Sequence, residues 1–286
     1  MTTGTLFLVA TPIGNLGDIS MRAIQTLAEV DFIASEDTRV TRKLLLHLDL
    51  KKQLVSYHEH NRRDSGEKIV TRLLSGETCA LVTDAGTPSI SDPGEDLVCI
   101  CAEAGIPIMA IPGPCAAVTA LALSGLPAGR FAFEGFLSTA KKSRFERLNE
   151  LKSEKRTMIF YEAPHKLMRT LKDMIVVFGD RRVSISRELT KLYEETLRCT
   201  LSEATDHFEQ TPPRGEFVLI VDGAHEDHAL ERDLEQATAT VKAYIENGLS
   251  IKDAIKKTAD ETGVAKNVLY RATINRELGV KEVPDS

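Results

Sequence analysis

The first 115 residues alternate short apolar runs with segments of helical periodicity. Such alternation is typical of βαβ units, in which helices join parallel strands. In the first helical segment, Ile19 to Val30, apolar positions recur at helical spacing, and Asp18 is the predicted N-cap. The pattern therefore predicts a mainly parallel sheet with strands in TLFLVAT (5–11), FIASED (32–37), QLVSY (53–57), CALVTDAG (79–86) and IPIMAIPG (106–113).

The pattern changes after about Arg130. From residue 181 onward the strand-like runs follow one another with little room for helices between them, which favours a mixed or antiparallel sheet. The small-residue stretch at 115–129 predicts a helix and hinge between the two halves. The predicted strands of the second half lie in FAFEGFL, TMIFYEAP, VSISREL, ETLRCTL and EFVLIV.

The chain after Asp222 has a different character. An acidic stretch predicts a solvated linker or the entry to a helix. Ser250 and Gly263 are the predicted cap and end of a later helix, and the short turn at 263–265 is typical of a helix-turn-helix unit. Helical patterns cover 237–246, 251–262 and 266–277.

The fold class predicted is therefore α/β, with two α/β domains and a small helical tail. A length of 286 residues accommodates that organisation, and 42% hydrophobic with 27% charged residues is typical of a globular protein. The predicted boundaries are 1–117 for the N-terminal α/β domain, 118–225 for the second and 226–286 for the tail.

Composition also limits the partners. A formal net charge of −6 argues against a protein that coats nucleic acid indiscriminately, so any nucleic-acid contact should be local. The N-terminal apolar run is short and lacks a basic segment before it, which predicts a buried strand, no membrane segment and a cytoplasmic protein. Five cysteines without a C-x-x-C pair predict neither a disulfide framework nor a structural metal.

Two turns rich in glycine and proline are the strongest candidates for a ligand site. TDAGTPSISDPG (83–94) and IPGPCAA (111–117) each follow an apolar strand. Because glycine has no Cβ and proline fixes φ, such turns let backbone groups approach a ligand closely. In a parallel sheet, both turns should lie at the carboxyl edge, where ligands bind. The alternative is a pair of tight βα connections. TPIGNLGD (11–18) matches neither G-x-G-x-x-G nor a P-loop.

The ordered motifs of the chain resemble those of a known family. They are TPIGNLGD, SEDTR (35–39), HEHN (58–61), TDAGTPSISDPG, IPGP, FEGFL (133–137), FYEAPHK (160–166), RELTKLYEE (187–195) and GEFVLIV (215–221). In this order they resemble the tetrapyrrole methylase superfamily, and within it the branch that acts on small-subunit ribosomal RNA. The resemblance covers nearly the whole chain.

This resemblance implies a fold, a cofactor and a reaction. The fold has a cofactor cleft between two α/β domains, the cofactor is S-adenosyl-L-methionine, and the protein is a homodimer. The reaction is methyl transfer to the ribose 2′-hydroxyl of a cytidine in the decoding centre of 16S ribosomal RNA. The cofactor contacts implied by position are Asp84, Gly86, Thr87, Pro88, Ser89, Ile90, Pro112, Gly113, Pro114, Cys115, Ala116, Phe136, Leu137, Tyr161, Glu162, Ala163, Pro164, Glu216 and Phe217.

A base should help remove the hydroxyl proton in such a reaction. Candidates in the matching stretches are Asp37, Glu59, His60, His165 and Glu188, and the sequence does not choose between them. His58 and His60 would share one face of an extended segment, as metal ligands do, but the sequence places no third ligand, so no metal is predicted.

Basic residues indicate where RNA would bind. The segment 141–156 holds seven Lys and Arg against three Glu, which favours a phosphate-binding surface or, alternatively, a solvated helix face. Residues 236–286 are nearly neutral, which suits an auxiliary RNA contact better than an independent DNA reader. The RNA-binding candidates are Arg39, Arg42, Lys43, Arg62, Arg63, Lys141, Lys142, Arg144 and Arg147.

Two other functions remain open at this point. A tetrapyrrole carbon methyltransferase of the same superfamily would need neither a basic surface nor a helical tail. A non-enzymatic regulator would bind DNA through the tail and a metabolite in the α/β cleft, although the near-neutral tail weighs against it.

Overall fold

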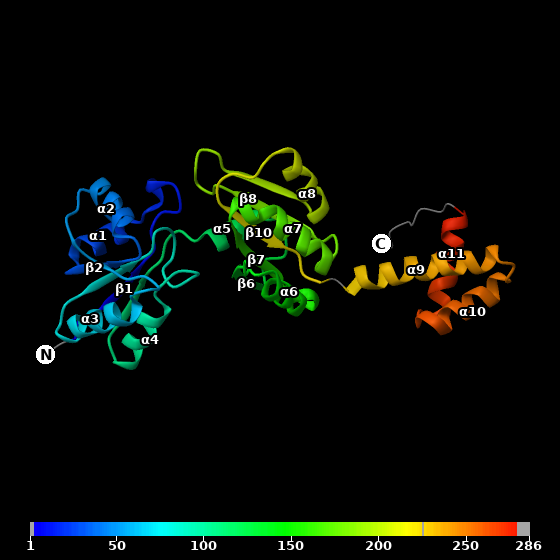
Figure 1. Ribbon diagram of the computed structural model, residues 1–286, viewed down its shortest axis with the longest axis horizontal. Helices are drawn as coiled ribbons and strands as arrows, with labels where there is room; N and C mark the ends of the chain where they lie inside the picture. The colour runs from blue at the N-terminus through cyan, green and yellow to red at the C-terminus, as the bar shows by residue number, and fades with distance from the viewer. Residues whose placement is uncertain (1–2, 225, 279–286) are drawn as a thin grey trace, which may run out of the picture. The chain divides into compact units, whose positions relative to one another are not determined.

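The computed structural model describes residues 3–224 and 226–278. The chain divides into two compact units, Met1–Gly223 and Ala224–Ser286. The first unit holds both sheets, and the second is helical (Figure 1).

The strands of the first sheet are parallel, as the alternating pattern predicts, and their order is β3-β2-β4-β1-β5. The N-cap of the first helix is Ser20 and not Asp18, because the Ser20 side chain accepts the Ala23 amide at 3.1 Å while Asp18 closes a 3-10 turn. The strands are β1 (Leu6–Val9), β2 (Phe32–Ser35), β3 (Gln53–Ser56), β4 (Cys79–Val82) and β5 (Ile108–Ile111). The helices are α1 (Met21–Glu29), α2 (Thr38–His47), α3 (Arg62–Leu74) and α4 (Glu95–Glu103).

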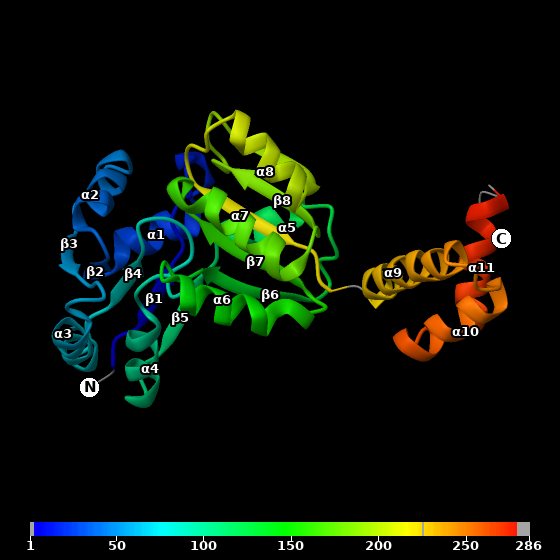
Figure 2. The ribbon, with the colours of Figure 1, turned by 45° about the vertical axis from the view of Figure 1, so that its right-hand side comes forward.

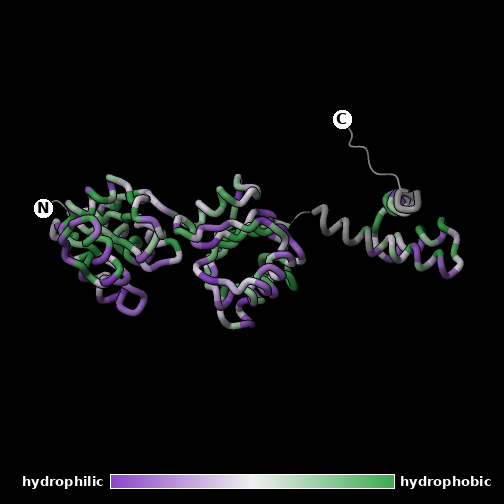
Figure 3. Tube along the Cα trace, turned by 90° about the horizontal axis from the view of Figure 1, so that it is seen from above, coloured by the Kyte–Doolittle hydropathy of each residue, from purple (hydrophilic) through white to green (hydrophobic). Residues whose placement is uncertain are grey.

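Helices cover both faces of this sheet. Phe32 faces a hydrophobic cluster with α3 and α4, whereas the next residue, Ile33, faces a cluster with α1 and α2. Figure 1 shows the same two layers of helices, and in Figure 3 hydrophobic segments gather inside this body with hydrophilic ones at its periphery. A parallel sheet buried on both faces directs its ligand loops to the carboxyl ends of its strands.

The second sheet is mixed, with strand order β6-β7-β10-β8-β9 and only the β6–β7 pair parallel. The expectation of little room for helices is wrong at one place, since α8 lies between β9 and β10; Thr200 ends β9 and forms a capping box with Glu203. The strands are β6 (Phe131–Phe136), β7 (Thr157–Glu162), β8 (Arg182–Arg187), β9 (Glu195–Thr200) and β10 (Phe217–Val221). The helices are α5 (Ala116–Leu123), α6 (Lys141–Glu150), α7 (Pro164–Phe178) and α8 (Leu201–Gln210).

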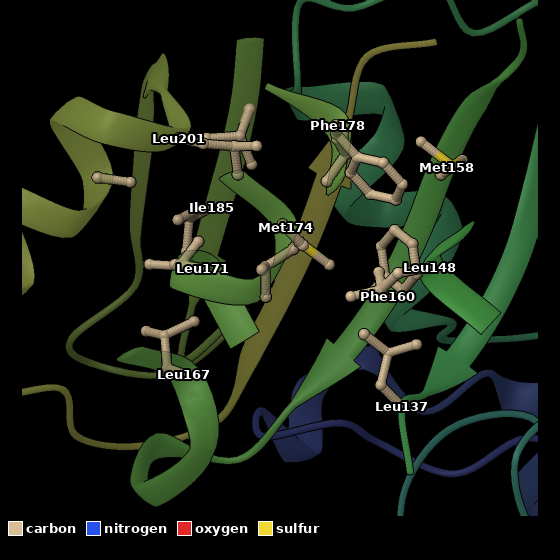
Figure 4. Packing of buried hydrophobic residues seen from close by; sticks show 14 of the residues in the cluster. Leu137, Leu148, Met158, Phe160, Leu167, Leu171, Met174, Phe178, Ile185 and Leu201 are labelled. Carbon is tan, nitrogen blue, oxygen red and sulfur yellow. The ribbon is translucent and has the colours of Figure 1, made fainter. Parts of the chain in front are cut away.

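The faces of the second sheet pack against different helices. One face packs against α6, α7 and α8, and Figure 4 shows Leu171 and Met174 of α7 among the side chains of Phe160 and Ile185. The other face packs against α5, which follows the IPGP turn. Figure 2 shows α6, α7 and α8 on the same side of this sheet, away from α5.

The second unit consists of α9 (Glu226–Glu246), α10 (Ile251–Thr262) and α11 (Lys266–Leu278). Ser250 caps α10 by accepting the Asp253 amide at 3.2 Å, and Gly263 ends it at φ 75°, as the sequence predicts. The acidic stretch enters a helix, so α9 begins well before the predicted residue 237. Across residues 3–224 and 226–278, no helix has the length and apolar character needed to cross a membrane.

Candidate active site

The turn after β4 has the constrained backbone that its glycines and prolines predict. Gly86 has φ +88°, and its N–H and C=O exchange hydrogen bonds with Thr11 at 3.0 and 2.9 Å. Ser89 and Ser91 also adopt positive φ, at 69° and 63°. Non-glycine residues in this region store strain and gather at functional sites.

One cavity, here named cavity A, has a volume of about 490 Å³. Its lining comes from the turn after β4, the start of α5, and the edge of the second sheet. Thirteen predicted cofactor contacts line it: Asp84, Gly86, Thr87, Ile90, Cys115, Ala116, Phe136, Tyr161, Glu162, Ala163, Pro164, Glu216 and Phe217. Sequence reasoning missed Ile13, Ala85, Ser91, Asp92, Leu189 and Val218.

Six predicted contacts lie outside cavity A. Ser89 lines a second cavity, and Leu137 is buried in the core beneath the second sheet. Pro114 holds the turn in place, because its carbonyl accepts the Thr87 hydroxyl at 3.1 Å, and Gly113 packs so closely on Ala10 that a Cβ would come to 3.0 Å. Pro88 and Pro112 are likewise absent from the lining.

The second cavity, cavity B, has a volume of about 530 Å³ and a more polar lining. It includes the turn before α3, where the HEHN motif lies, and the start of α4. Ser91 and Asp92 line both cavities, so they form the wall that cavities A and B share. The lining is Glu36, Tyr57, His58, Glu59, His60, Arg62, Ser89, Ser91, Asp92, Pro93, Gly94, Glu95 and Asp96.

Aromatic rings form part of cavity A. Tyr161 contacts Phe133 and Phe136 edge to face, with ring centroids 5.2 and 5.5 Å apart. Its hydroxyl accepts the Ala117 amide at 3.1 Å, which fixes the ring against the first turn of α5. Burial raises the pKa of Tyr161 to about 12, so this hydroxyl stays neutral. The wall therefore suits a flat apolar group.

Carboxyl groups gather near the shared wall. Burial raises the pKa of Asp92 to about 6, with a further contribution from the charge of Glu36. Burial also raises the pKa values of Glu36 and Asp84. The Thr83 hydroxyl donates to Glu36 Oε2 at 3.2 Å and opposes the shift of Glu36. A carboxyl with a pKa near the working pH is suited to proton transfer.

Two predicted acid–base carboxyls have other partners. Asp37 caps α2 and forms a 2.6 Å ion pair with Arg39, whose hydrogen bonds lower the pKa of Asp37 to about 2. Glu188 accepts Lys191 Nζ at 2.9 Å and the Glu216 amide at 3.0 Å, and lines neither cavity A nor cavity B.

The two histidine candidates, His60 and His165, lie in different parts of the structure. His60 lines cavity B, together with Glu59, while His165 is exposed in the first turn of α7 beside Pro164. The expectation of an extended HEHN segment is wrong, because His58 to Asn61 form a turn in which the Asn61 amide donates to the His58 carbonyl at 3.0 Å. The described side chains contain no cluster of three or more potential metal ligands.

One residue must be removed from the RNA-binding set. Arg144 is only 2% exposed, pairs with Asp173 at 2.8 Å and donates to the carbonyls of Ser138 and Thr139. It is a structural residue of α6, because a guanidinium with these internal partners has no face left for phosphate. Arg147 is half-exposed and paired with Glu134 and Glu150. The remaining candidates are exposed: Arg39, Arg42, Lys43, Arg62, Arg63, Lys141 and Lys142.

Residues 5–205 match the family of tetrapyrrole (corrin/porphyrin) methylases, and the chain belongs to this family. Solved structures support the fold: cobalt precorrin-4 methyltransferase aligns with TM-score 0.57 and 17% identity over 76% of this chain and 94% of that one. Uroporphyrin-III C-methyltransferase from Thermus thermophilus, solved with S-adenyl homocysteine, aligns with TM-score 0.54 and 17% identity over 77% and 97%.

Two curated relatives extend the similarity to nearly the full chain, and both carry the name ribosomal RNA small subunit methyltransferase I. The protein of Halalkalibacterium halodurans is 51% identical over 270 residues, covering 93% of each chain. That of Synechocystis sp. is 44% identical over 275 residues, covering 96% of this chain and 99% of the relative.

Proposed function

We propose that this protein is an S-adenosylmethionine-dependent methyltransferase that methylates small-subunit ribosomal RNA. The acceptor we propose is the ribose 2′-hydroxyl of a cytidine in the decoding centre. The observation that carries this proposal is the similarity to relatives named as ribosomal RNA methyltransferases, at 51% and 44% identity over 93% and 96% of the chain. That similarity extends beyond the part covered by the solved tetrapyrrole methylases, which is 76% to 77%.

Cavity A fits the methyl donor. A volume of about 490 Å³ lies in the usual range for a small-molecule site. Phe217, Leu189 and Val218 offer an apolar surface to an adenine ring, and Asp84 offers a carboxylate to hydroxyl or ammonium groups. Gly86 has φ +88°, a conformation that residues with a Cβ rarely adopt, so glycine allows the turn to line this wall with its backbone. When bound, S-adenosylmethionine supplies a methyl group on a positively charged sulfonium.

The residues of this chain contribute chiefly by positioning. Cavities A and B adjoin at Ser91 and Asp92, so a ribose hydroxyl that enters from cavity B would meet the methyl group beside these two residues. Alignment of two reactants in this way lowers the barrier by several kcal/mol, up to about 7–11 kcal/mol in well-oriented systems. Tyr161 and Phe136 exclude water from one side of cavity A, while the strained turn at Ser89 and Ser91 fixes the wall.

Exposed basic side chains of α2, α3 and α6 are the proposed contacts to RNA phosphates. Arg62 lines cavity B and pairs with Asp96 at 2.8 Å, and Arg63 follows it on α3. Arg39, Arg42 and Lys43 lie on α2, and Lys141 and Lys142 begin α6. We further propose a cytoplasmic homodimer, in which residues 1–117 and 118–225 form the two α/β domains and 226–286 an auxiliary RNA contact.

The test is methyl transfer from labelled S-adenosylmethionine to small ribosomal subunits that lack the modification. The proposed function predicts one 2′-O-methylcytidine, located by ribose-specific mapping, and no transfer to uroporphyrinogen III. Transfer to the tetrapyrrole alone would identify a carbon methyltransferase instead. Transfer to neither substrate, with assembled subunits and naked RNA both offered, would overturn the proposal.

A further inference from the structure

Asp92 differs from the other carboxyl residues of the site because it lies on the wall between the two cavities. It lines both cavity A and cavity B, whereas Glu36 lines only cavity B and Asp84 only cavity A of these two. It follows Ser91, a residue held at φ 63°, in the turn between β4 and α4. A group on a wall between two cavities can face an atom that enters from either side.

We propose that Asp92 is the proton acceptor for the ribose hydroxyl, and that Glu36 is a positioning residue that acts through Asp92. This proposal rests on the proposed function, since it assigns cavity A to the methyl donor and cavity B to the acceptor nucleotide. Asp92 is not among the candidate bases named from the sequence, which are Asp37, Glu59, His60, His165 and Glu188.

The step balances without a further reactant. The hydroxyl O–H bond breaks and its proton passes to the Asp92 carboxylate while a bond forms between the oxygen and the methyl carbon. The bond from sulfur to that carbon breaks, and its electron pair stays on sulfur, so the sulfonium becomes a neutral thioether. Asp92 later returns its proton to solvent.

Cavity B carries unused hydrogen-bonding atoms that suit a nucleotide. Among the described residues, Ser89 Oγ and His58 Nδ1 are buried and have no hydrogen-bond partner. Both residues line cavity B. Buried polar atoms are nearly always satisfied, so atoms left open on a cavity wall point to a polar ligand. His58 is held here because the Asn61 side chain accepts its backbone N–H at 2.8 Å.

The environment of Asp92 suits a base better than that of Asp37. The pKa of Asp92 is raised to about 6, so the group is ionised at neutral pH yet basic enough to take a proton. Asp37, with a pKa lowered to about 2 by Arg39, is a much weaker base. The other charged or titratable groups on the two walls are Glu36, Tyr57, His58, Glu59, His60, Arg62, Glu95 and Asp96 in cavity B, and Asp84, Cys115, Tyr161, Glu162 and Glu216 in cavity A.

The first experiment compares Asp92→Asn with wild type on small ribosomal subunits. We expect kcat to fall about 10²- to 10⁴-fold, the usual contribution of a general base, with KM for the subunit within threefold. Asp92→Glu, which keeps a carboxyl, should recover part of the loss. Asp206→Asn, an exposed aspartate of α8, is the matched control and should keep wild-type activity.

The second experiment has readouts that a merely structural role would not change. The pH profile of kcat should show an acidic limb near pH 6, because activity is lost as Asp92 becomes protonated. Glu36→Gln removes a neighbouring negative charge and should shift this limb to lower pH. A ¹³C NMR titration of the free protein should report the same shift for the Asp92 carboxyl in Glu36→Gln. Asp92→Asn should still bind S-adenosylhomocysteine, so that the loss of kcat is not a loss of the donor.

The outcomes separate this inference from the function on which it rests. If the wild-type enzyme methylates the subunit but Asp92→Asn retains kcat within threefold, Asp92 is not the acceptor and the function stands. An unmoved acidic limb in Glu36→Gln would remove Glu36 as the positioning residue. If the wild type transfers no methyl group to the subunit, the proposed function and this assignment fall together.

Discussion

The two sheets contribute different chemistry to the site. The first sheet, all parallel, brings carboxyl groups to the ends of β2 and β4, where burial raises the pKa values of Glu36 and Asp84. The second sheet, mixed in direction, contributes Phe136, Tyr161 and Phe217, which form an aromatic wall of cavity A. The comparison teaches that the carboxyl groups with raised pKa values come from the first half of the molecule, whereas the aromatic rings of cavity A come from the second.

The largest expected effect is on stability, and it distinguishes a buried structural arginine of α6 from an exposed lysine of the same helix that is a candidate for RNA binding. Arg144→Ala leaves Asp173 without its buried partner, and we expect the free energy of unfolding to fall by about 3–5 kcal/mol. Lys142→Ala, on the same helix and 89% exposed, should change it by less than about 0.5 kcal/mol. Urea denaturation measures both. Equal small losses would mean that Arg144 is available to a ligand after all.

The next prediction tests a carboxyl group at the end of a strand in the first sheet. Asp84→Ala removes a carboxyl that lines cavity A and accepts the Asp37 amide at 3.1 Å. Hydrogen bonds to charged groups contribute about 1.5–3 kcal/mol, so the affinity for S-adenosylhomocysteine should fall roughly 10- to 100-fold. Isothermal titration calorimetry, with Asp206→Asn as control, provides the measurement. Unchanged affinity would place the donor site elsewhere.

The smallest effect concerns RNA affinity. Replacing Lys141 and Lys142 by Gln removes two exposed positive charges at the start of α6. If each contacts one phosphate of single-stranded RNA, the slope of log affinity against log salt should become less steep by about 1.4. Filter binding over a salt series gives the slope. A slope identical to that of wild type would show that this surface does not face RNA.

The sequence predicts the fold well, because hydrophobic alternation and turn residues act locally. The parallel direction of the strands in the first sheet and the caps at Ser250 and Gly263 follow from such local patterns, whereas the strand order does not. The hydrophobic pattern does not predict α8, because the strand-like run continues up to the β-branched Thr200. The spacing of Thr200 and Glu203, which form a capping box, is the local signal for this helix. The prediction of Asp18 as a cap is wrong because Asp and Ser are both good caps, and only the geometry shows that Ser20 caps α1.

The candidate site could be predicted only in part. Glycine and proline leave a clear trace in a sequence, and the turn at Gly86 lines cavity A as that trace predicts. The lining residues up to Pro164 follow from the family resemblance instead. No sequence pattern indicates the role of Asp92. Its raised pKa depends on burial and on the charge of Glu36, which lies 56 residues away in the chain. The same limit explains Arg144, whose burial against Asp173 no local pattern reveals.

A crystal structure with bound S-adenosylhomocysteine tests the central claim most directly. The claim is that the methyl donor occupies cavity A and that the acceptor approaches through cavity B. The account predicts adenosine against Phe217 and Leu189, and a thioether sulfur that faces the wall at Asp92. A ligand seated in cavity B, or one whose sulfur lies away from Asp92, would contradict the account.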